Sequence, residues 1–290
     1  MTGPILEVRD LSVTFPIMSR GLMRRQVGEL EAVKQVSFSV RPGETLGIVG
    51  ESGSGKTTLT RAILRAIDPS AGVVNYDSEQ LGMVDLARIS PEALKPLRTE
   101  LQMIFQDPFA SLNPRMKVGD IVAEPLVIHE PHNSETHRGR VISMLQRVGL
   151  DADALHRFPH AFSGGQRQRI GIARALVMHP RLVVCDEAVS ALDVSVQAQV
   201  LNLLADLQDE MGLTYLFVAH DLGVVHHFCD AALVMYRGDV VESGPVEELF
   251  AAPQHDYTRL LLSAIPSTDP DEPLEPLERS SLDLTPGEKN

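Results

Sequence analysis

The sequence contains very little cysteine. Cys185 and Cys229 are the two cysteines among 290 residues, which is too few for a disulfide framework or for a metal cluster held by cysteines. A reducing compartment is therefore the natural setting for this chain, and neither thiol is expected to be functional.

Long apolar runs and an excess of basic residues are also missing. No stretch approaches the roughly 18 to 20 apolar residues of a membrane-spanning helix, and Glu7, Arg9 and Asp10 interrupt any signal-peptide core. The formal net charge is -13, which argues against a sequence-independent nucleic-acid binder. With 43% hydrophobic residues the chain can bury one large core or two modest ones, so we expect a globular protein.

A glycine-rich stretch carries the strongest signal that is present. Residues 50–57, Gly-Glu-Ser-Gly-Ser-Gly-Lys-Thr, fit the phosphate-binding pattern G-x-x-x-x-G-K-[ST] at every fixed position. A strand is predicted before it at 45–49, and a helix after it whose apolar face runs from Leu59 to Ile67. In such a loop backbone N–H groups converge on a polyphosphate, Lys56 reaches the outer phosphates and Thr57 offers a hydroxyl to Mg2+. The alternative is a glycine-rich turn before an ordinary helix.

Polar residues follow three other apolar strands. Residues 182–185 lead into Asp186 and Glu187, and His220 and Gln106 follow the predicted strands that end before them. Because two buried carboxylates are costly without a cation or a function, we interpret Asp186 as holding Mg2+ through water and Glu187 as polarising an attacking water. An exposed acidic turn is the alternative for this pair, and Gln106 taken alone is more often a plain loop residue.

Residues 118–160 contain predicted helices and no strand, which indicates a helical insert. After it, Ser163-Gly164-Gly165-Gln166 begins a helix that runs to about Met178. Free N–H groups at such a helix start would form a second anion site. The alternative for Ser163 is an ordinary helix N-cap.

The two ends of the chain differ in character. Segments from Leu6 to Phe15 and at 33–40 predict β structure, with a loop at 16–30 between them. Phe15 can stack on a purine ring or belong to the core of its strand, and the sequence leaves both interpretations open. Residues 266–290 hold five prolines and seven acids against two bases, so we expect a disordered acidic tail.

Taken together and in this order, the motifs resemble the nucleotide-binding subunit of an ABC transporter, up to about Ile265. The segments 105–115 and 257–266 resemble, more narrowly, the oligopeptide, dipeptide and nickel importer group. The resemblance implies an α/β fold: a P-loop NTPase core with a mixed sheet, an N-terminal antiparallel β subdomain and an inserted helical subdomain at about 107–178. The nucleotide-binding domain would span 1–265 and the tail 266–290.

The resemblance also implies which residues act on ATP and Mg2+. Phe15 would stack on adenine, Gln106 would sense Mg2+ and the γ-phosphate, Glu187 would be the general base and His220 would contact the γ-phosphate. The implied catalytic residues are Lys56, Gln106, Glu187 and His220, and the implied metal-binding residues are Thr57, Gln106 and Asp186. The implied nucleotide-binding residues are Phe15, Gly50, Glu51, Ser52, Gly53, Ser54, Gly55, Lys56, Thr57, Thr58, Ser163, Gly164, Gly165, Gln166 and Asp193.

Partners follow from the same resemblance. Two such subunits, identical or related, would sandwich two ATPs, with Ser163, Gly164 and Gly165 completing the site of the other subunit. Two membrane permease subunits would dock near 109–112, a solute-binding protein would take part indirectly, and no nucleic acid is expected. The location implied is cytoplasmic, peripheral on the inner face of the plasma membrane. Ala188 stands where the family usually has proline, and this change removes no catalytic group.

The leading hypothesis is therefore the ATP-binding and ATP-hydrolysing subunit of an importer for oligopeptides, dipeptides or nickel, driven by dimer closure on two ATPs. Two non-transport alternatives remain: an ATPase of DNA repair or translation, and an accessory subunit of phosphonate breakdown. Repair relatives usually insert long coiled coils or zinc-binding cysteines, and translation relatives usually carry two such domains in tandem. This sequence has neither feature.

Overall fold

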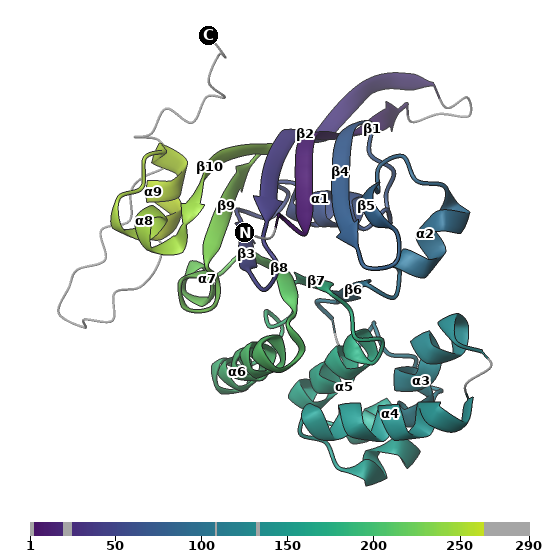
Figure 1. The fold of residues 1–290 in the computed structure, drawn as a ribbon. Coiled ribbons are helices and arrows are strands. Elements are labelled where there is room, and N and C mark those ends of the chain that lie inside the picture. The colour runs from purple at the N-terminus through teal and green to yellow at the C-terminus, as the bar shows by residue number, and fades with distance from the viewer. Residues whose placement is uncertain (1–2, 20–24, 108, 132–133, 264–290) are drawn as a thin grey trace, which may run out of the picture.

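The computed structural model describes residues 3–19, 25–107, 109–131 and 134–263. Two β sheets and the helices around them make up this part of the chain (Figure 1). One sheet is antiparallel, with the strand order β2-β1-β4-β5, and the other has six strands in the order β10-β9-β3-β8-β7-β6. The predicted α/β class, with a mixed sheet and an N-terminal antiparallel sheet, is confirmed. The predicted tail at 266–290 lies outside the described residues.

The antiparallel sheet is built from β1 (Leu6–Met18), β2 (Gln26–Val40), β4 (Ala71–Ser78) and β5 (Gly82–Asp85). The predicted loop at 16–30 is too long at both ends. Strand β1 continues to Met18 and β2 begins at Gln26, and the two form a ribbon in which Phe15 pairs with Leu30. Pro16 fits into this ribbon because β1 no longer pairs with β4 beyond Ser12. Phe15 is 38% exposed, so its alternative as a core residue is wrong.

The six-stranded sheet carries the strands that matter for function: β3 (Thr45–Val49), β6 (Leu101–Ile104), β7 (Leu182–Asp186), β8 (Thr214–Ala219) and β9 (Ala231–Tyr236). These five are parallel, and β10 (Asp239–Pro245) closes one edge as an antiparallel hairpin with β9. Every residue of β3, β7 and β8 is buried, as expected where both faces of a parallel sheet are covered.

Two hydrophobic cores lie on the opposite faces of this sheet. Ile48 and Leu216 point into the core shared with the antiparallel sheet, whereas Val49 and Phe217 point into the core shared with most of the helices. Side chains alternate along a strand, so each strand is held from both sides. The ends of these strands are therefore fixed in position.

The helices beside the sheets are α1 (Lys56–Ile63), α2 (Pro91–Leu97), α6 (Val194–Met211), α7 (Leu222–Phe228), α8 (Val246–Ala251) and α9 (Asp256–Ser263). Helix α1 ends earlier than the predicted Ile67, because Arg65 adopts the left-handed conformation (φ 53°) and turns the chain out of the helix. Helix α6 has Asp193 as its N-cap and Gly212 as its left-handed C-cap.

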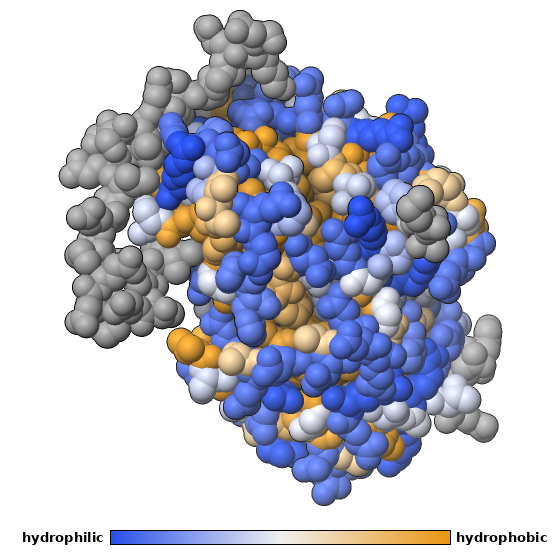
Figure 2. All heavy atoms as spheres, turned by 60° about the vertical axis from the view of Figure 1, so that its left-hand side comes forward, coloured by the Kyte–Doolittle hydropathy of each residue, from blue (hydrophilic) through white to orange (hydrophobic). Residues whose placement is uncertain are grey.

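The remaining helices form a separate group, at the lower right of Figure 1. They are α3 (Val118–His129), α4 (Ser134–Arg147), the 3-10 turns η1 (Ala152–His156) and η2 (Pro159–Ala161), and α5 (Gly164–Leu176). Their apolar faces join the helix-side core. In the described residues, no helix has the length and apolarity needed to cross a membrane. On the face shown in Figure 2, hydrophilic residues are interspersed with apolar patches.

Candidate functional site

Four neighbouring parallel strands deliver the predicted residues to one edge of the sheet. In the order β3-β8-β7-β6, the glycine-rich loop and His220 follow the first two strands, Asp186 ends the third with Glu187 directly after it, and Gln106 lies beyond the end of the fourth. Carboxyl ends of parallel strands meet at the same edge of a sheet, where open α/β folds place their ligands. Strand β6 ends at Ile104, one residue before the predicted end at Phe105, so Gln106 lies on a loop and not at the strand tip itself.

The glycine-rich loop has a backbone that needs its glycines. Gly50, Gly53 and Gly55 have φ values of 145°, 82° and 106°, which side chains rarely tolerate. A Cβ on Gly50 would lie 2.2 Å from the carbonyl oxygen of Met235, and one on Gly55 would lie 2.3 Å from that of Ala32. A Cβ on Gly53 would meet no atom within 4 Å, so open space borders the loop there.

Lys56 is buried at the start of α1 and bends back over this loop. Its Nζ donates to the carbonyl oxygens of Gly50 (2.6 Å) and Glu51 (2.9 Å). Burial lowers the pKa of Lys56, and the nearby carboxylates of Glu187, Asp186 and Glu51 oppose that shift. Ser54 also has a buried hydroxyl, which lacks a hydrogen-bond partner in the described part of the chain. An ammonium, an unpaired hydroxyl and open space beside Gly53 together fit a bound phosphate chain.

Thr57 and Asp186 bring two oxygen atoms together between α1 and β7. The Thr57 hydroxyl donates to Oδ1 of Asp186 at 3.0 Å, and Oδ2 of Asp186 lies 4.0 Å from Nη2 of Arg61. Burial raises the pKa of Asp186, although the Thr57 hydroxyl and the Arg61 guanidinium both act to lower it. A buried carboxylate beside a threonine hydroxyl has the hard oxygen chemistry that suits Mg2+.

Glu187 is the point on which the other strand ends converge. Its Oε2 accepts a hydrogen bond from Nε2 of Gln106 at 2.7 Å and lies 3.5 Å from Nδ1 of His220. The residue has a φ of 50°, a strained conformation for a side chain with a Cβ, and its N–H donates to the carbonyl of Val218. The carboxylate is therefore aimed by the backbone and held by two side chains that lie far away in sequence.

The structure does not join every predicted residue to this cluster. Ser163 and Gln166 cap α5 reciprocally, each side chain bonding the other's backbone N–H, so the ordinary N-cap alternative describes Ser163 within this chain. Gly165 packs against Val196, where a Cβ would approach to 2.4 Å. Asp193 caps α6. The nucleotide-binding roles of these residues and of Phe15 stay predictions.

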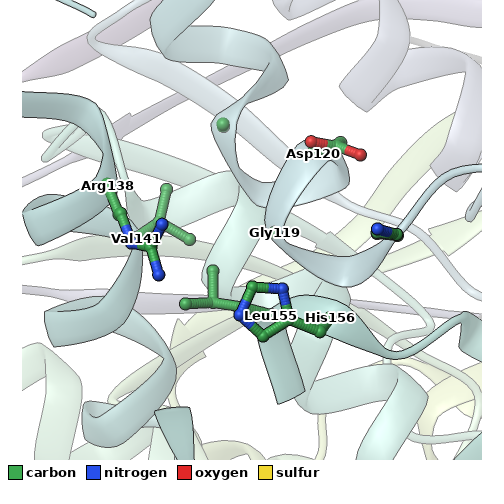
Figure 3. Close-up of a pocket in the computed structure, with 8 residues that line it drawn as sticks. Gly119, Asp120, Arg138, Val141, Leu155 and His156 are labelled. Atoms are coloured by element: carbon green, nitrogen blue, oxygen red, sulfur yellow. The ribbon is translucent and has the colours of Figure 1, made fainter. Parts of the chain in front are cut away.

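Hollows lie around the site and in the helical group. One of about 530 Å³ borders Gln106 and Asp186 directly, and a groove of about 440 Å³ next to it runs between α1 and α3. Arg61, Phe105 and Arg174 line both. A third hollow of about 320 Å³ lies within the helical group between α3, α4 and η1, where Asp120, Arg138 and His156 face it (Figure 3).

Two residues of the site were missed by sequence reasoning. Arg61 lies near Asp186 because α1 and β7 meet there. Tyr257 belongs to no recognisable sequence pattern, yet its hydroxyl contacts the glycine-rich loop. Tyr257 belongs to a segment that we used only for its resemblance to the importer group. Helical spacing marks Arg61 as one residue of a polar face, so neither position carries a local signal.

Comparison with known proteins gives a consistent family. The sequence matches the family described as "ABC transporter" over residues 33–190 and the one described as "Oligopeptide/dipeptide transporter, C-terminal region" over residues 241–287. The oligopeptide transport ATP-binding protein OppF of Haemophilus influenzae is 49% identical over 287 residues, which is 98% of this chain and 83% of that protein.

The glutathione import ATP-binding protein GsiA of Pectobacterium atrosepticum is 48% identical over 267 residues, or 92% of this chain. The match covers 42% of GsiA, so the chain spans about two fifths of the length of that relative. Neither relative's name points to DNA repair, translation or phosphonate breakdown.

Solved structures agree with the sequence relatives. CbiO1 from Clostridium perfringens, described as part of the ABC transporter complex cbiONQ, has a TM-score of 0.72 at 28% identity, covering 86% of this chain and 91% of that one. The ATP-binding cassette MJ0796, in a dimeric post-hydrolysis state bound to ADP and Pi, has a TM-score of 0.70 at 27% identity, covering 83% and 98%. With its fold, its ordered motifs and these matches, the chain belongs to the ATP-binding cassette family of ABC transporters.

Proposed function

We propose that this chain binds ATP with Mg2+, hydrolyses it, and thereby powers a peptide-type ABC importer. The observation that carries the proposal is the convergence of Gln106 and His220 on the Glu187 carboxylate, beside the loop that holds Lys56. A strained, doubly held carboxylate next to a phosphate loop is the arrangement expected of a group that removes a proton from an attacking water. The names of OppF and GsiA support a peptide-type solute.

The glycine-rich loop would hold the phosphates. Backbone N–H groups of residues 50–58 and the start of α1 would donate to phosphate oxygens, and Lys56 would exchange one of its carbonyl partners for an outer phosphate. The unpaired hydroxyl of Ser54 supports this use of the loop. Phe15, exposed on the β1–β2 ribbon, would stack on the adenine ring.

Thr57 and Asp186 would hold Mg2+, with Gln106 as a further ligand once it leaves Glu187. Bound Mg2+ would neutralise charge on the phosphates. Glu187 would take the proton from water, and His220 would keep the carboxylate oriented and contact the γ-phosphate. Because Gln106 donates a hydrogen bond to Glu187, a move of its side chain to Mg2+ would also change the contacts of the proposed base.

A second subunit, identical or related, would complete the site. Ser163, Gly164, Gly165, Gln166 and Asp193 lie at the starts of α5 and α6, and Val194 beside them is an apolar residue with 83% of its surface exposed. A helix start that bears a glycine pair suits the phosphate of a partner's ATP. Exposure of a large apolar side chain at that place supports a dimer interface.

The membrane permease subunits would dock in the groove of about 440 Å³ and over the loop beside it. Phe105, Phe109 and Ile128 are apolar side chains exposed around this region. Such a groove suits a short helix from a membrane partner, which would place this chain on the inner face of the plasma membrane. A solute-binding protein would deliver the solute to the permeases.

Coexpression with two permease subunits of a peptide importer tests the proposal. We expect the chain to copurify with them in detergent, and the complex to hydrolyse ATP with Mg2+ and transport peptide in proteoliposomes. An active ATPase that binds no permease would favour a non-transport function. A chain without ATPase activity, either alone or in the complex, would contradict the proposal.

A further inference from the structure

The C-terminal helix α9 contacts the phosphate loop through one side chain. The hydroxyl oxygen of Tyr257 accepts a hydrogen bond from the N–H of Glu51 at 2.9 Å, across 206 residues of sequence. The Tyr257 side chain is fully buried. It lies in the region that matches the oligopeptide/dipeptide transporter C-terminal family and not in the region that matches the ABC transporter family.

The same peptide unit is bonded at its other end by Lys56. The peptide that joins Gly50 to Glu51 has the N–H that donates to Tyr257 and the carbonyl that accepts from Nζ of Lys56 at 2.6 Å. A peptide unit is planar, so its N–H and C=O turn together. A rotation that breaks the bond to Tyr257 therefore also displaces the oxygen that holds the Lys56 ammonium.

The position of Tyr257 is fixed from both directions. Its ring packs on that of Tyr236 at the end of β9, with 4.3 Å between the centroids. The turn before α9 is held by Glu242 of β10, whose carboxylate accepts the N–H groups of Gln254 (2.7 Å) and His255 (3.0 Å). The Tyr257 N–H in turn donates to Nδ1 of His255.

Strand β9 also contacts the loop directly. The carbonyl oxygen of Met235, next to Tyr236, lies where a Cβ on Gly50 would come within 2.2 Å. The start of the loop is thus confined between β9 and α9. Among the contacts that confine it, the Tyr257 hydroxyl supplies a hydrogen bond that phenylalanine would lack.

We propose that Tyr257 is a positioning residue for the phosphate loop, which fixes the Gly50–Glu51 peptide and through it the Lys56 ammonium. The C-terminal region then contributes to nucleotide affinity through the position of the loop. The affinity measurement for this inference rests on the proposed binding of ATP. How rigidly the loop is held in the nucleotide-free protein can be measured without that binding.

The test compares Tyr257→Phe with Tyr236→Phe, which removes a hydroxyl from the adjacent ring and leaves the Glu51 bond intact. Loss of one hydrogen bond of ordinary strength predicts that Tyr257→Phe weakens the affinity for a fluorescent ATP analogue about 3- to 10-fold. It should raise the KM for ATP by a similar factor and leave kcat at saturating ATP unchanged. Tyr236→Phe should resemble the unchanged protein in both measurements.

Hydrogen–deuterium exchange on the nucleotide-free protein supplies the second readout. Peptides covering residues 50–56 should exchange faster in Tyr257→Phe and not in Tyr236→Phe, with melting temperatures recorded to verify that both variants fold. Unchanged exchange and unchanged affinity in Tyr257→Phe would overturn the inference, as would equal effects of the two variants. If the unchanged chain binds no ATP, the proposed function fails, while the exchange comparison still decides the role of Tyr257.

Discussion

The side-chain amide of Gln106 donates to the carboxylate of Glu187 at 2.7 Å, although the two residues lie 81 positions apart. Gln106 sits on the loop that follows β6, and Glu187 directly follows the buried strand β7. The amide must break this hydrogen bond before it can take a position as a metal ligand. The carboxylate that we assign as the general base and the loop that we assign to permease docking are therefore joined by a hydrogen bond.

Replacing Glu187 with Gln should stop hydrolysis and keep nucleotide binding. The amide retains the shape of the side chain but cannot take a proton from water, and general-base catalysis contributes roughly 10²- to 10⁴-fold. We expect the ATPase rate to fall by about that factor. Size-exclusion chromatography with ATP and Mg2+ should show the variant accumulating as a dimer. Undiminished turnover would exclude Glu187 as the base.

Replacing Gly55 with Ala should disrupt the phosphate loop. The new Cβ would lie 2.3 Å from the backbone carbonyl of Ala32 at a φ of 106°, so the loop must move or strain. We expect loss of ATP binding and a lower melting temperature. Gly171→Ala is the matched control, because this glycine lies within α5 and a Cβ there meets no atom within 4 Å. That control should gain roughly 0.5 to 1 kcal/mol of stability. Normal ATP affinity in Gly55→Ala would contradict the loop geometry.

The Asp186→Asn variant should show opposite effects on stability and on metal binding. Burial raises the pKa of Asp186, so the folded, metal-free state holds its proton more tightly than the unfolded state does. The stability that this provides is present at acid pH and is lost as the pH rises through the raised pKa. Asn carries no charge at any pH, so the variant should melt higher than the unchanged protein above that pKa and equally at acid pH.

Calorimetric melts of both proteins without nucleotide, from about pH 4 to pH 8, measure this difference. In the same variant, Mg2+-dependent stabilisation by ATP should disappear, because the amide oxygen is a weaker Mg2+ ligand than a carboxylate. If the melting temperature of Asp186→Asn exceeded that of the unchanged protein by less as the pH rises, the pKa of Asp186 would not be raised in the folded state.

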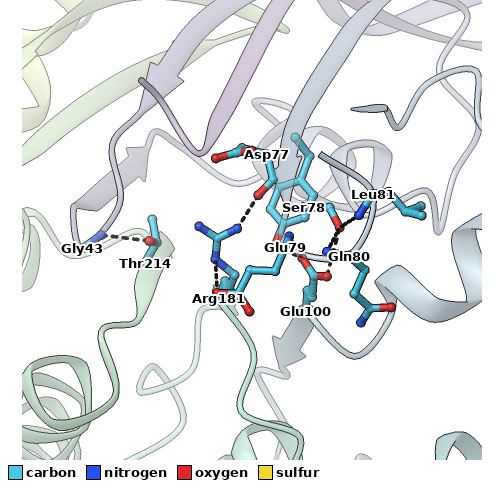
Figure 4. Close-up of polar contacts among 10 residues, drawn as sticks. Gly43, Asp77, Ser78, Glu79, Gln80, Leu81, Glu100, Arg181 and Thr214 are labelled. Atoms are coloured by element: carbon cyan, nitrogen blue, oxygen red, sulfur yellow. Dashed lines mark hydrogen bonds and ion pairs between the residues drawn. The ribbon is translucent and has the colours of Figure 1, made fainter. Parts of the chain in front are cut away.

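Glu100 should be essential for joining the antiparallel sheet to the six-stranded sheet. Its buried carboxylate, just before β6, accepts hydrogen bonds from the hydroxyls of Tyr76 (3.1 Å) and Ser78 (3.0 Å) and from the N–H of Glu79 (3.2 Å) (Figure 4). Glu100→Ala leaves these donors without their acceptor, so we expect a loss of about 3 kcal/mol or more in the free energy of unfolding.

Glu79→Ala is the matched control for this change. Glu79 forms an ion pair with Arg181 at 3.3 Å, but its side chain is largely exposed, and such pairs contribute roughly 0 to 1 kcal/mol. Urea unfolding of the two variants measures the contrast. Equal losses of unfolding free energy in the two variants would show that the buried hydrogen bonds of Glu100 contribute no more to stability than an exposed ion pair.

Much of this site can be predicted because its residues follow strands. The apolar runs before Asp186 and His220 are short, continuous and buried on both faces, so the sequence marks both the strand and its end. Parallel order then brings the ends together. The position of Gln106 depends on where β6 ends, and the predicted strand was one residue too long.

The parts that could not be predicted depend on contacts between distant segments. The ribbon at 16–18 and 26–30 extends the pairing of Phe15 with Leu30, whereas Pro16 alone indicates a loop. Tyr257 has no spacing relation to Glu51, and its hydrogen bond depends on the packing of α9 against β9. The starts of α5 and α6 are identified by their caps, but a role toward a second subunit lies beyond the contacts within this chain.

The two-sided burial of β3, β7 and β8 has a mechanical consequence. The strands behind the groove beside Phe105 are packed against a core on either face, whereas the loop after β6 borders the groove directly. A docked membrane helix would therefore displace the Gln106 amide relative to a stationary carboxylate. In the proposed importer, docking at the membrane would then influence hydrolysis through the hydrogen bond between Gln106 and Glu187.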